Sequence, residues 1–235
     1  MENAIEVRFL KFDISEKRDA YNLSKYTSEE KRKKINKFKN DADYNRSLYA
    51  DIMIRQFFME KFSLTNEEVK IVYDSLGKPY VENYGNVYFS VSHSGSYVMA
   101  AFGLKPIGVD VEELRNMDFK GLASRYFDHL EENYIFDIDD KDEIMKRFYE
   151  IWTVKESYTK LLGAGLSRGL KYFVVEKPMD KKNEFNVKNK SLGEIYLAKS
   201  YGIDKNYIFS VCSDRPSFDI LLNKIDISKT KDIFK

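Results

Sequence analysis

Two carboxylates share one face of an apolar strand in the segment Ile107 to Glu112, which has the sequence IGVDVE. Side chains alternate along a strand, so Asp110 and Glu112 lie on one side and the apolar residues lie on the other. Neighbouring carboxylates repel each other unless they are exposed, protonated or bridged by a cation. Magnesium prefers such oxygen ligands and commonly adds water and substrate phosphates. The segment indicates either a magnesium site or a solvated acidic edge.

A second segment adds a third carboxylate and a cation. Residues Trp152 to Lys160 (WTVKESYTK) have a helical pattern, which places Glu156 and Lys160 one turn apart on the same face. An ordinary surface ion pair is the simpler interpretation. The functional interpretation is a third metal ligand beside a cation directed at a phosphate. The glycine-containing turn Gly163 to Ser167 then ends the helix.

A histidine stands among small hydroxyl residues in Ser90 to Gly95 (SVSHSG). At a strand end such a group can donate hydrogen bonds to phosphate oxygens, although a structural role for His93 is the alternative. A hydrolase with Ser92 and His93 as its nucleophilic pair is disfavoured, because strand neighbours point to opposite faces. No Gly-x-Ser-x-Gly turn accompanies the pair.

Basic residues gather between Lys31 and Lys39, and Arg46 follows them. A solvated helix face is the ordinary explanation. Nucleic-acid binding would predict an affinity that falls steeply with salt. However, Lys+Arg number 39 against 38 for Asp+Glu, and no nucleic-acid-binding motif is present. We therefore expect no nucleic-acid partner.

The elements that must position these residues alternate between strands and helices, which indicates an α+β fold. Strands are expected at Ile5 to Phe12, Val87 to Val91, Tyr97 to Phe102, Ile107 to Val111, Lys171 to Val175, Glu194 to Lys199 and Tyr207 to Val211. Helices are expected at Ser28 to Phe62 with a break near Asn40 to Asp43, at Phe119 to Ile135 and at Asp142 to Leu162. A turn is expected at Asp74 to Pro79, and an exposed loop or hairpin at Asp180 to Lys190.

A weak internal sequence similarity links Phe89 to Ser92 (FSVS) with Phe209 to Cys212 (FSVC). It suggests a duplicated α+β unit with a pseudo-twofold axis, and two unrelated strands are the alternative. We expect an N-terminal subdomain at residues 1–104 and a C-terminal subdomain at 105–235 that carries the acidic residues.

Composition argues against a disulfide-bonded, thiolate-zinc or membrane-spanning protein. The single cysteine, Cys212, cannot form an internal disulfide or a thiolate zinc cluster. No stretch approaches the roughly 20 apolar residues of a membrane span, and the charged start does not resemble a signal peptide. With 17 Tyr and 17 Phe available for a core, we expect a folded cytoplasmic protein without a membrane partner.

In this order the segments resemble the 4'-phosphopantetheinyl transferases of the surfactin-synthetase-activating type. The resemblance extends from Ser28 to Ser213, and it rests on four motifs: Gly77 to Pro79, Ser90 to Ser94, Gly108 to Glu112 and Trp152 to Ser157. It implies a monomeric pseudo-twofold fold with coenzyme A bound in the cleft between the halves. It also implies a magnesium-dependent enzyme.

The resemblance implies a role for each matching residue. Asp110, Glu112 and Glu156 would hold magnesium. Lys160 would lie near the leaving phosphate and His93 would contact the phosphates. The coenzyme A contacts would be Lys31, Lys34, Arg46, Ser47, Lys78, Pro79, Ser92, His93, Lys155 and Lys160. A glutamate close to the metal site would be Glu131, with Glu132 as the alternative alignment.

The implied reaction attaches the phosphopantetheine arm of coenzyme A to a serine of an apo carrier protein and releases 3',5'-ADP. Glu156, directly or through a metal-bound water, is the expected base, with Glu131 as an alternative. A module that binds coenzyme A or a carrier protein without transfer is the competing interpretation, and binding without product would favour it. The carrier could serve fatty-acid, polyketide or peptide synthesis.

Overall fold

A computed structural model describes residues 4–163, 169–177, 183–190 and 193–234. Its helices are α1 (Glu29–Ile35), α2 (Asp41–Phe62), α3 (Phe119–Tyr126), α4 (His129–Phe136) and α5 (Lys141–Leu162), with 3-10 segments η1 (Ser24–Tyr26) and η3 (Ile227–Phe234). Its strands are β1 (Ala4–Lys11), β2 (Ile71–Tyr73), β3 (Pro79–Val81), β4 (Tyr88–Ser94), β5 (Tyr97–Gly103), β6 (Ile107–Glu113), β7 (Phe173–Glu176), β8 (Glu184–Asn189), β9 (Ile195–Asp204), β10 (Tyr207–Ser213) and β11 (Asp219–Lys224). The α+β class is therefore confirmed.

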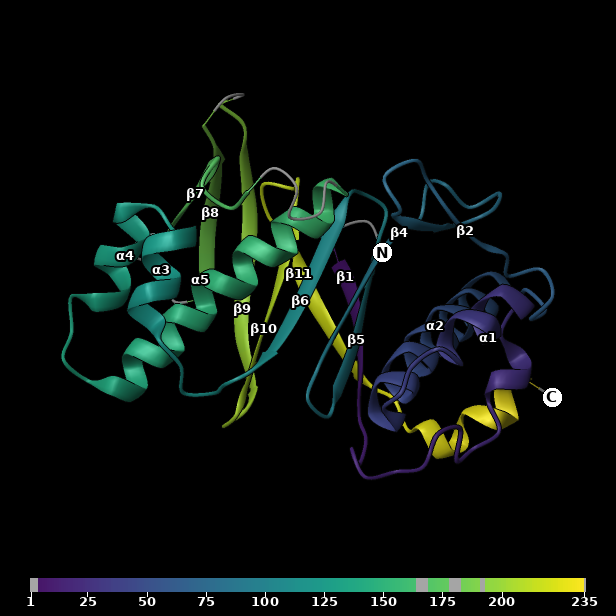
Figure 1. Ribbon diagram of the computed structural model, residues 1–235. Coiled ribbons are helices and arrows are strands. Elements are labelled where there is room, and N and C mark those ends of the chain that lie inside the picture. The colour runs from purple at the N-terminus through teal and green to yellow at the C-terminus, as the bar shows by residue number, and fades with distance from the viewer. Residues whose placement is uncertain (1–3, 164–168, 178–182, 191–192, 235) are drawn as a thin grey trace.

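Two sheets form the middle of the molecule, and helices cover their outer faces (Figure 1). The first sheet has the order β11-β1-β5-β4 and carries α2, while the second has the order β6-β10-β9-β8-β7 and carries α5. One apolar cluster lies under α2, one lies under α5, and a third lies between the sheets, where Val7 and Met99 face Val109 and Val211. Burial of these clusters is the main force that holds the layers together.

The strand order repeats between the halves. In the first sheet β1 pairs with β5 and β5 with β4; in the second β6 pairs with β10 and β10 with β9. The repeat makes β5 equivalent to β10. The internal sequence similarity instead relates Phe89 to Ser92 of β4 with Phe209 to Cys212 of β10, and these two strands are not equivalent in the repeat. The boundary between residues 104 and 105 stays a prediction. Strand β11, which lies in the predicted C-terminal subdomain, pairs with β1 of the first sheet.

The structure differs from the sequence predictions in several elements. The expected helix at Phe119 to Ile135 is two helices, because Asp128 and Glu131 form a capping box that begins α4. The exposed loop or hairpin expected at Asp180 to Lys190 contains strand β8, which pairs with β7 and β9, and the expected exposure is wrong for its alternate residues, which are buried. Residues 180–182 lie outside the described residues. The sequence patterns do not predict β2, β3, β11, η1 or η3. Residues 164–168, in the predicted turn, lie outside the described residues, while Gly163 ends α5 in the left-handed conformation, with φ 69°.

Among the described helices, none is both long enough and apolar enough to cross a membrane.

Helix α5 approaches β6 so closely that only glycine fits at position 108. A Cβ on Gly108 would lie 1.8 Å from the Ser157 carbonyl oxygen and 2.7 Å from the Leu161 nitrogen. This contact fixes the distance between the acidic strand and the helix that carries the third carboxylate.

We expect Gly108→Ala to lower the free energy of unfolding by about 1–3 kcal/mol, because the helix must move away from the strand. Gly85→Ala is the matched control, since no atom lies within 4 Å of a Cβ built there. Urea unfolding of both variants measures the difference. Equal stabilities would contradict the close-packing argument.

Candidate active site

Strand β6 and helix α5 bring the three sequence-predicted carboxylates to one region. Asp110 is buried, and its Oδ1 lies 2.7 Å from the Lys160 Nζ. The Ser92 hydroxyl donates to the same oxygen at 2.8 Å. Lys160 Nζ also donates to Ser92 Oγ at 2.8 Å. Because Ser92 is engaged by Asp110 and Lys160, the geometry does not favour a Ser92–His93 nucleophilic pair.

Burial and mutual repulsion make this cluster electrostatically unfavourable without a cation. Burial first, and then the charge of Asp110, raise the pKa of Glu156 to about 7. The same two causes raise the pKa of Glu112, while the hydrogen bond from Ser94 and the positive charge of Lys160 act in the opposite direction. Among the described residues, Asp110 Oδ2 and Glu156 Oε1 are buried oxygens without a hydrogen-bond partner.

These features fit a hard divalent cation, which takes carboxylate oxygens as ligands and favours their ionised form. The side chains, however, are not converged as a ligand set. Within the described part of the chain, no group of three or more His, Cys, Asp or Glu residues is arranged to hold a metal ion. Lys160 supplies the positive charge beside Asp110 instead.

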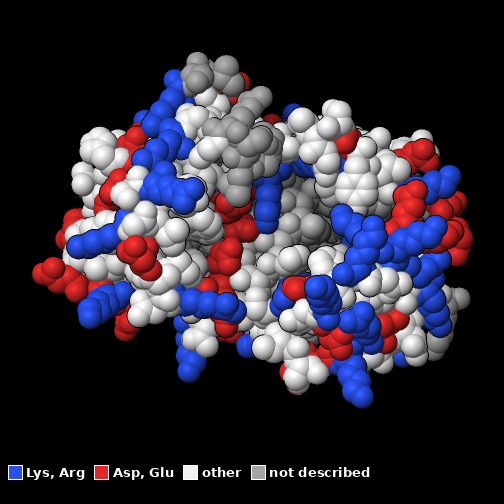
Figure 2. Space-filling model, viewed as in Figure 1, with Lys and Arg blue, Asp and Glu red and all other residues white. Residues whose placement is uncertain are grey.

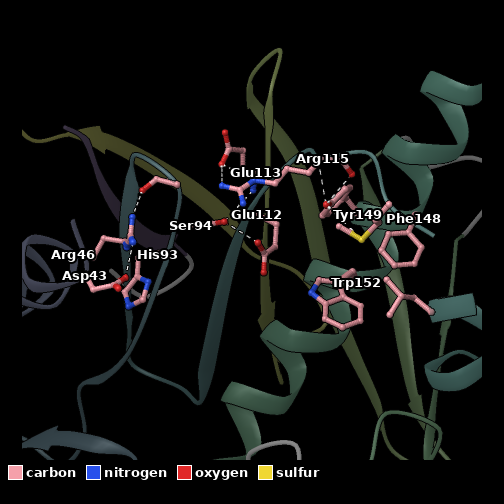
Figure 3. A pocket seen from close by; sticks show the side chains of 13 residues that line it. Asp43, Arg46, His93, Ser94, Glu112, Glu113, Arg115, Phe148, Tyr149 and Trp152 are labelled. Atoms are coloured by element: carbon pink, nitrogen blue, oxygen red, sulfur yellow. Dashed lines mark hydrogen bonds and ion pairs between the residues drawn. The ribbon is translucent and has the colours of Figure 1, made fainter. Parts of the chain in front are cut away.

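A pocket of about 420 Å³ lies beside Glu112, between the two halves. Figure 3 shows Arg46 and His93 on one side, the rings of Phe148, Tyr149 and Trp152 on the other, and Glu112 between them. The pocket thus joins polar groups to an apolar wall. Such a mixture suits an elongated ligand that has a charged end and an apolar end.

A smaller pocket of about 240 Å³ lies on the other side of Lys160, between the β2–β3 turn and the end of α5. Lys78 and Pro79 line it, together with Val91. Lys78 Nζ donates to the Leu161 carbonyl oxygen at 2.8 Å. This bond holds the turn against the end of α5, where the last carbonyls have no partner within the helix. Burial lowers the pKa of Lys78.

His93 and Arg46 meet at the first pocket. His93 is exposed on one side. Partial burial of its ring lowers its pKa, and the positive charges of Lys160 and Arg46 lower it further. Arg46 donates to the Gly95 carbonyl oxygen and to Asp43 Oδ1, at 2.6 Å each. A neutral His93 beside fixed cations can donate a hydrogen bond to an anion.

Charge is divided across the hollow between the halves. Figure 2 shows acidic atoms along one side of this hollow and a concentration of Lys and Arg atoms over α1 and α2 on the other. Lys31 is half-buried and Lys34 is exposed on α1, and Ser47 is half-buried on α2. These three residues line neither of the two pockets described above.

Comparisons with known proteins assign the chain to a family. A family model described as 4'-phosphopantetheinyl transferase superfamily matches residues 106–212, and one described as 4'-phosphopantetheinyl transferase, N-terminal, matches residues 15–103. The 4'-phosphopantetheinyl transferase ffp of Bacillus subtilis is 33% identical over 196 residues, which are 83% of this chain and 86% of the relative. The chain belongs to the 4'-phosphopantetheinyl transferase superfamily.

Two further relatives agree. Sfp of Bacillus subtilis (strain 168) is 32% identical over 193 residues, 82% of this chain and 84% of Sfp. The transferase gsp of Aneurinibacillus migulanus is 27% identical over 232 residues, 98% of this chain and 95% of gsp. The protein is thus a phosphopantetheinyl transferase enzyme, and the transferases of this superfamily move phosphopantetheine from coenzyme A to carrier proteins.

In the transferase, Lys155 and Glu131 form an ion pair with each other in the core. Both side chains are 0% exposed, and Lys155 Nζ lies 2.8 Å from Glu131 Oε1. Lys155 also donates to the carbonyl oxygens of Leu170 and Phe173. The cause is the helical period: consecutive residues diverge by about 100°, so Lys155 enters the core while Glu156 faces the cleft.

Sequence reasoning missed partners of the acidic residues. Ser94 donates to Glu112 Oε2 at 2.8 Å (Figure 3). Trp152 stands out in the sequence only as part of a motif, yet it lines the pocket beside Glu112. The alternation of serines at positions 90, 92 and 94 is the signal that would have indicated a shared face.

Proposed function

We propose that this transferase uses magnesium, held by Asp110, Glu112 and Glu156, to attach phosphopantetheine from coenzyme A to a serine of an apo acyl, peptidyl or aryl carrier protein. The observation that carries the proposal is the pair of buried oxygens without partners, Asp110 Oδ2 and Glu156 Oε1. A protein that only bound coenzyme A would have no need to crowd three carboxylates whose charges oppose one another.

The bound cation would supply charge neutralisation for the diphosphate of coenzyme A. The serine oxygen of the carrier protein forms a bond to the β-phosphorus, the bond from that phosphorus to the bridging oxygen breaks, and 3',5'-ADP leaves. Lys160 stabilises the negative charge that develops on the leaving group, and His93 donates a hydrogen bond to a phosphate oxygen. Glu156 accepts the serine proton, and its pKa of about 7 applies to the site before the cation binds.

The nucleotide end of coenzyme A would lie on the first half of the cleft. We assign the adenine to the pocket of Lys78 and Pro79. The phosphates would meet the basic group of Lys31, Lys34, Arg46 and Ser47, with Ser92 near the diphosphate. Lys155 supports the site from inside the core and does not touch the substrate.

Arg46 and Glu112, from the two halves of the chain, line the same pocket, so no second copy is needed to complete it and we propose that the transferase acts as a monomer. Cys212 is buried and free, as suits the reducing cytoplasm where we place the protein.

Mass spectrometry of an apo carrier protein, incubated with the transferase, coenzyme A and magnesium, tests the proposal. A mass increase equal to one phosphopantetheine arm, lost when EDTA is added, is expected. Transfer that continues in EDTA would overturn the metal assignment. Coenzyme A binding without a mass change, across several carrier proteins, would overturn transfer.

Protons should compete with magnesium for Glu156. Its pKa of about 7 means that this carboxyl is largely protonated at lower pH and must lose the proton to act as a ligand. We expect the magnesium concentration for half-maximal transfer to rise by up to about tenfold when the pH falls from about 8 to about 6. Magnesium titrations at several pH values measure this shift. A constant midpoint would contradict the role of Glu156 as a ligand.

A further inference from the structure

The two sheets meet at strands β4 and β6 without a backbone ladder. The first sheet ends at β4 and the second begins at β6, yet the two strands are in contact along their length. Since β6 pairs with β10 on one side only, alternate N–H groups of β6 face β4 and need acceptors.

Three serine hydroxyls provide these acceptors. Ser90 Oγ accepts from the Val109 N–H at 3.1 Å, Ser92 Oγ accepts from the Val111 N–H at 3.3 Å, and Ser94 Oγ accepts from the Glu113 N–H at 3.2 Å. The partner is 19 positions further along the chain in each case, so β4 and β6 run parallel and in register. We call Ser90, Ser92 and Ser94 the serine ladder.

Two members of the serine ladder also hold a carboxylate. Ser92 donates to Asp110 and Ser94 donates to Glu112, at 2.8 Å each and with an offset of 18 positions. The same offset places Ser90 opposite Gly108, which has no side chain to accept a hydrogen bond. Ser90 therefore joins the strands without touching the acidic cluster.

The Ser94 hydroxyl has one proton, and it both donates and accepts a hydrogen bond. Its lone pair accepts from the N–H of Glu113, so the proton is directed at the carboxylate of the preceding residue, Glu112. The hydroxyl belongs to the first half of the molecule and the carboxylate to the second. The orientation of Glu112 consequently depends on how the two halves are docked.

We propose that Ser94 is a positioning residue that sets the orientation of Glu112 for magnesium, and that the serine ladder couples the docking of the two halves to the geometry of the metal ligands. This inference rests on the proposed magnesium-dependent transfer. Partners that orient ligand side chains change metal affinity by about 10–100-fold when removed.

The test compares Ser94→Ala with Ser90→Ala, which loses the same kind of strand-to-strand hydrogen bond but no contact with a carboxylate. Ser90 also lines the pocket of Lys78 and Pro79, so the coenzyme A concentration that saturates each variant is determined first. Trp152 is the single tryptophan and lines the pocket beside Glu112. Its fluorescence is followed while magnesium is titrated into each protein saturated with coenzyme A, in the absence of a carrier protein. Thermal unfolding without magnesium measures what each lost hydrogen bond contributes to stability.

We expect Ser94→Ala to raise the magnesium midpoint about tenfold or more, and Ser90→Ala to change it less than about twofold, with similar losses of stability. Ser94→Thr, which keeps the hydroxyl, should restore the midpoint. If Ser94→Ala does not fold, Ser94→Cys keeps nearly the same shape with a weak donor, and should raise the midpoint as well.

Equal midpoints for Ser94→Ala and Ser90→Ala would overturn the positioning role while leaving the proposed function intact. A native midpoint in folded Ser94→Cys together with failure of Ser94→Thr would also overturn it, because shape rather than the hydroxyl would then matter. A wild-type protein that transfers phosphopantetheine in EDTA would overturn the metal assignment itself, and the role of Ser94 with it.

Discussion

Asp110→Asn is expected to slow phosphopantetheine transfer by about 10³-fold or more, with the fold intact. Asp110 is the most buried of the three acidic residues and contacts both Lys160 and Ser92. Asparagine has the same shape and can still accept from Ser92, but it removes the negative charge that the cation and Lys160 require. The rate at which the apo carrier protein gains mass measures the effect.

Asp204→Asn is the control for the loss of an aspartate that pairs with a lysine. Asp204 lies on β9 and accepts from Lys11 Nζ at 3.1 Å, outside the cleft. Its replacement should change the transfer rate less than about threefold, because exposed pairs contribute little. Should Asp110→Asn keep more than about a tenth of the wild-type rate, Asp110 could not be an essential ligand.

The chemistry of the cleft was predictable where it depends on local periodicity. Alternation along one strand places Asp110 and Glu112 on the same face, and one helical turn separates Glu156 from Lys160. These rules need only a few neighbouring residues. The structure brings Lys160 to Asp110 as part of the same cluster.

What the sequence did not reveal depends on contacts between distant segments. None of the residues of β11 is buried, and the strand pairs with β1 across the whole length of the chain, so no local apolar pattern marks it. The serine ladder requires β4 and β6 to be adjacent and parallel, which alternation within one strand cannot show. Gly108 likewise has meaning only once α5 crosses β6.

Lys155 shows how a motif can mix two roles. It stands next to Glu156 in the motif, and its position suggested a contact with coenzyme A. In the structure it is fully buried with Glu131, which also accepts N–H groups of Asp128 and Val175. The lysine thereby ties α5 to the start of α4 and to β7. We infer that it fixes the direction in which the next residue, Glu156, leaves the helix.

Removing one member of this buried pair should be strongly destabilising. We expect Lys155→Met to lower the free energy of unfolding by about 3–5 kcal/mol near neutral pH, because it leaves the Glu131 carboxylate buried without its cation. Glu131→Gln should cost a comparable amount, and the double variant should cost less than the sum of the two. Urea unfolding of the four proteins measures the coupling. Lys188→Met, which breaks the exposed pair with Glu176, should change stability by less than about 1 kcal/mol.

The pH dependence of Lys155→Met separates a buried charge from a simple loss of packing. Burial raises the pKa of Glu131, and removal of Lys155 takes away the contact that opposes this shift. A carboxyl whose folded pKa is raised stabilises the fold below its unfolded pKa, and that stability is lost as the pH rises through the folded value. The loss caused by Lys155→Met should therefore be smaller near pH 4 than near pH 7, since Glu131 can then be neutral. A loss that is the same at both pH values would mean that Lys155 acts through packing alone.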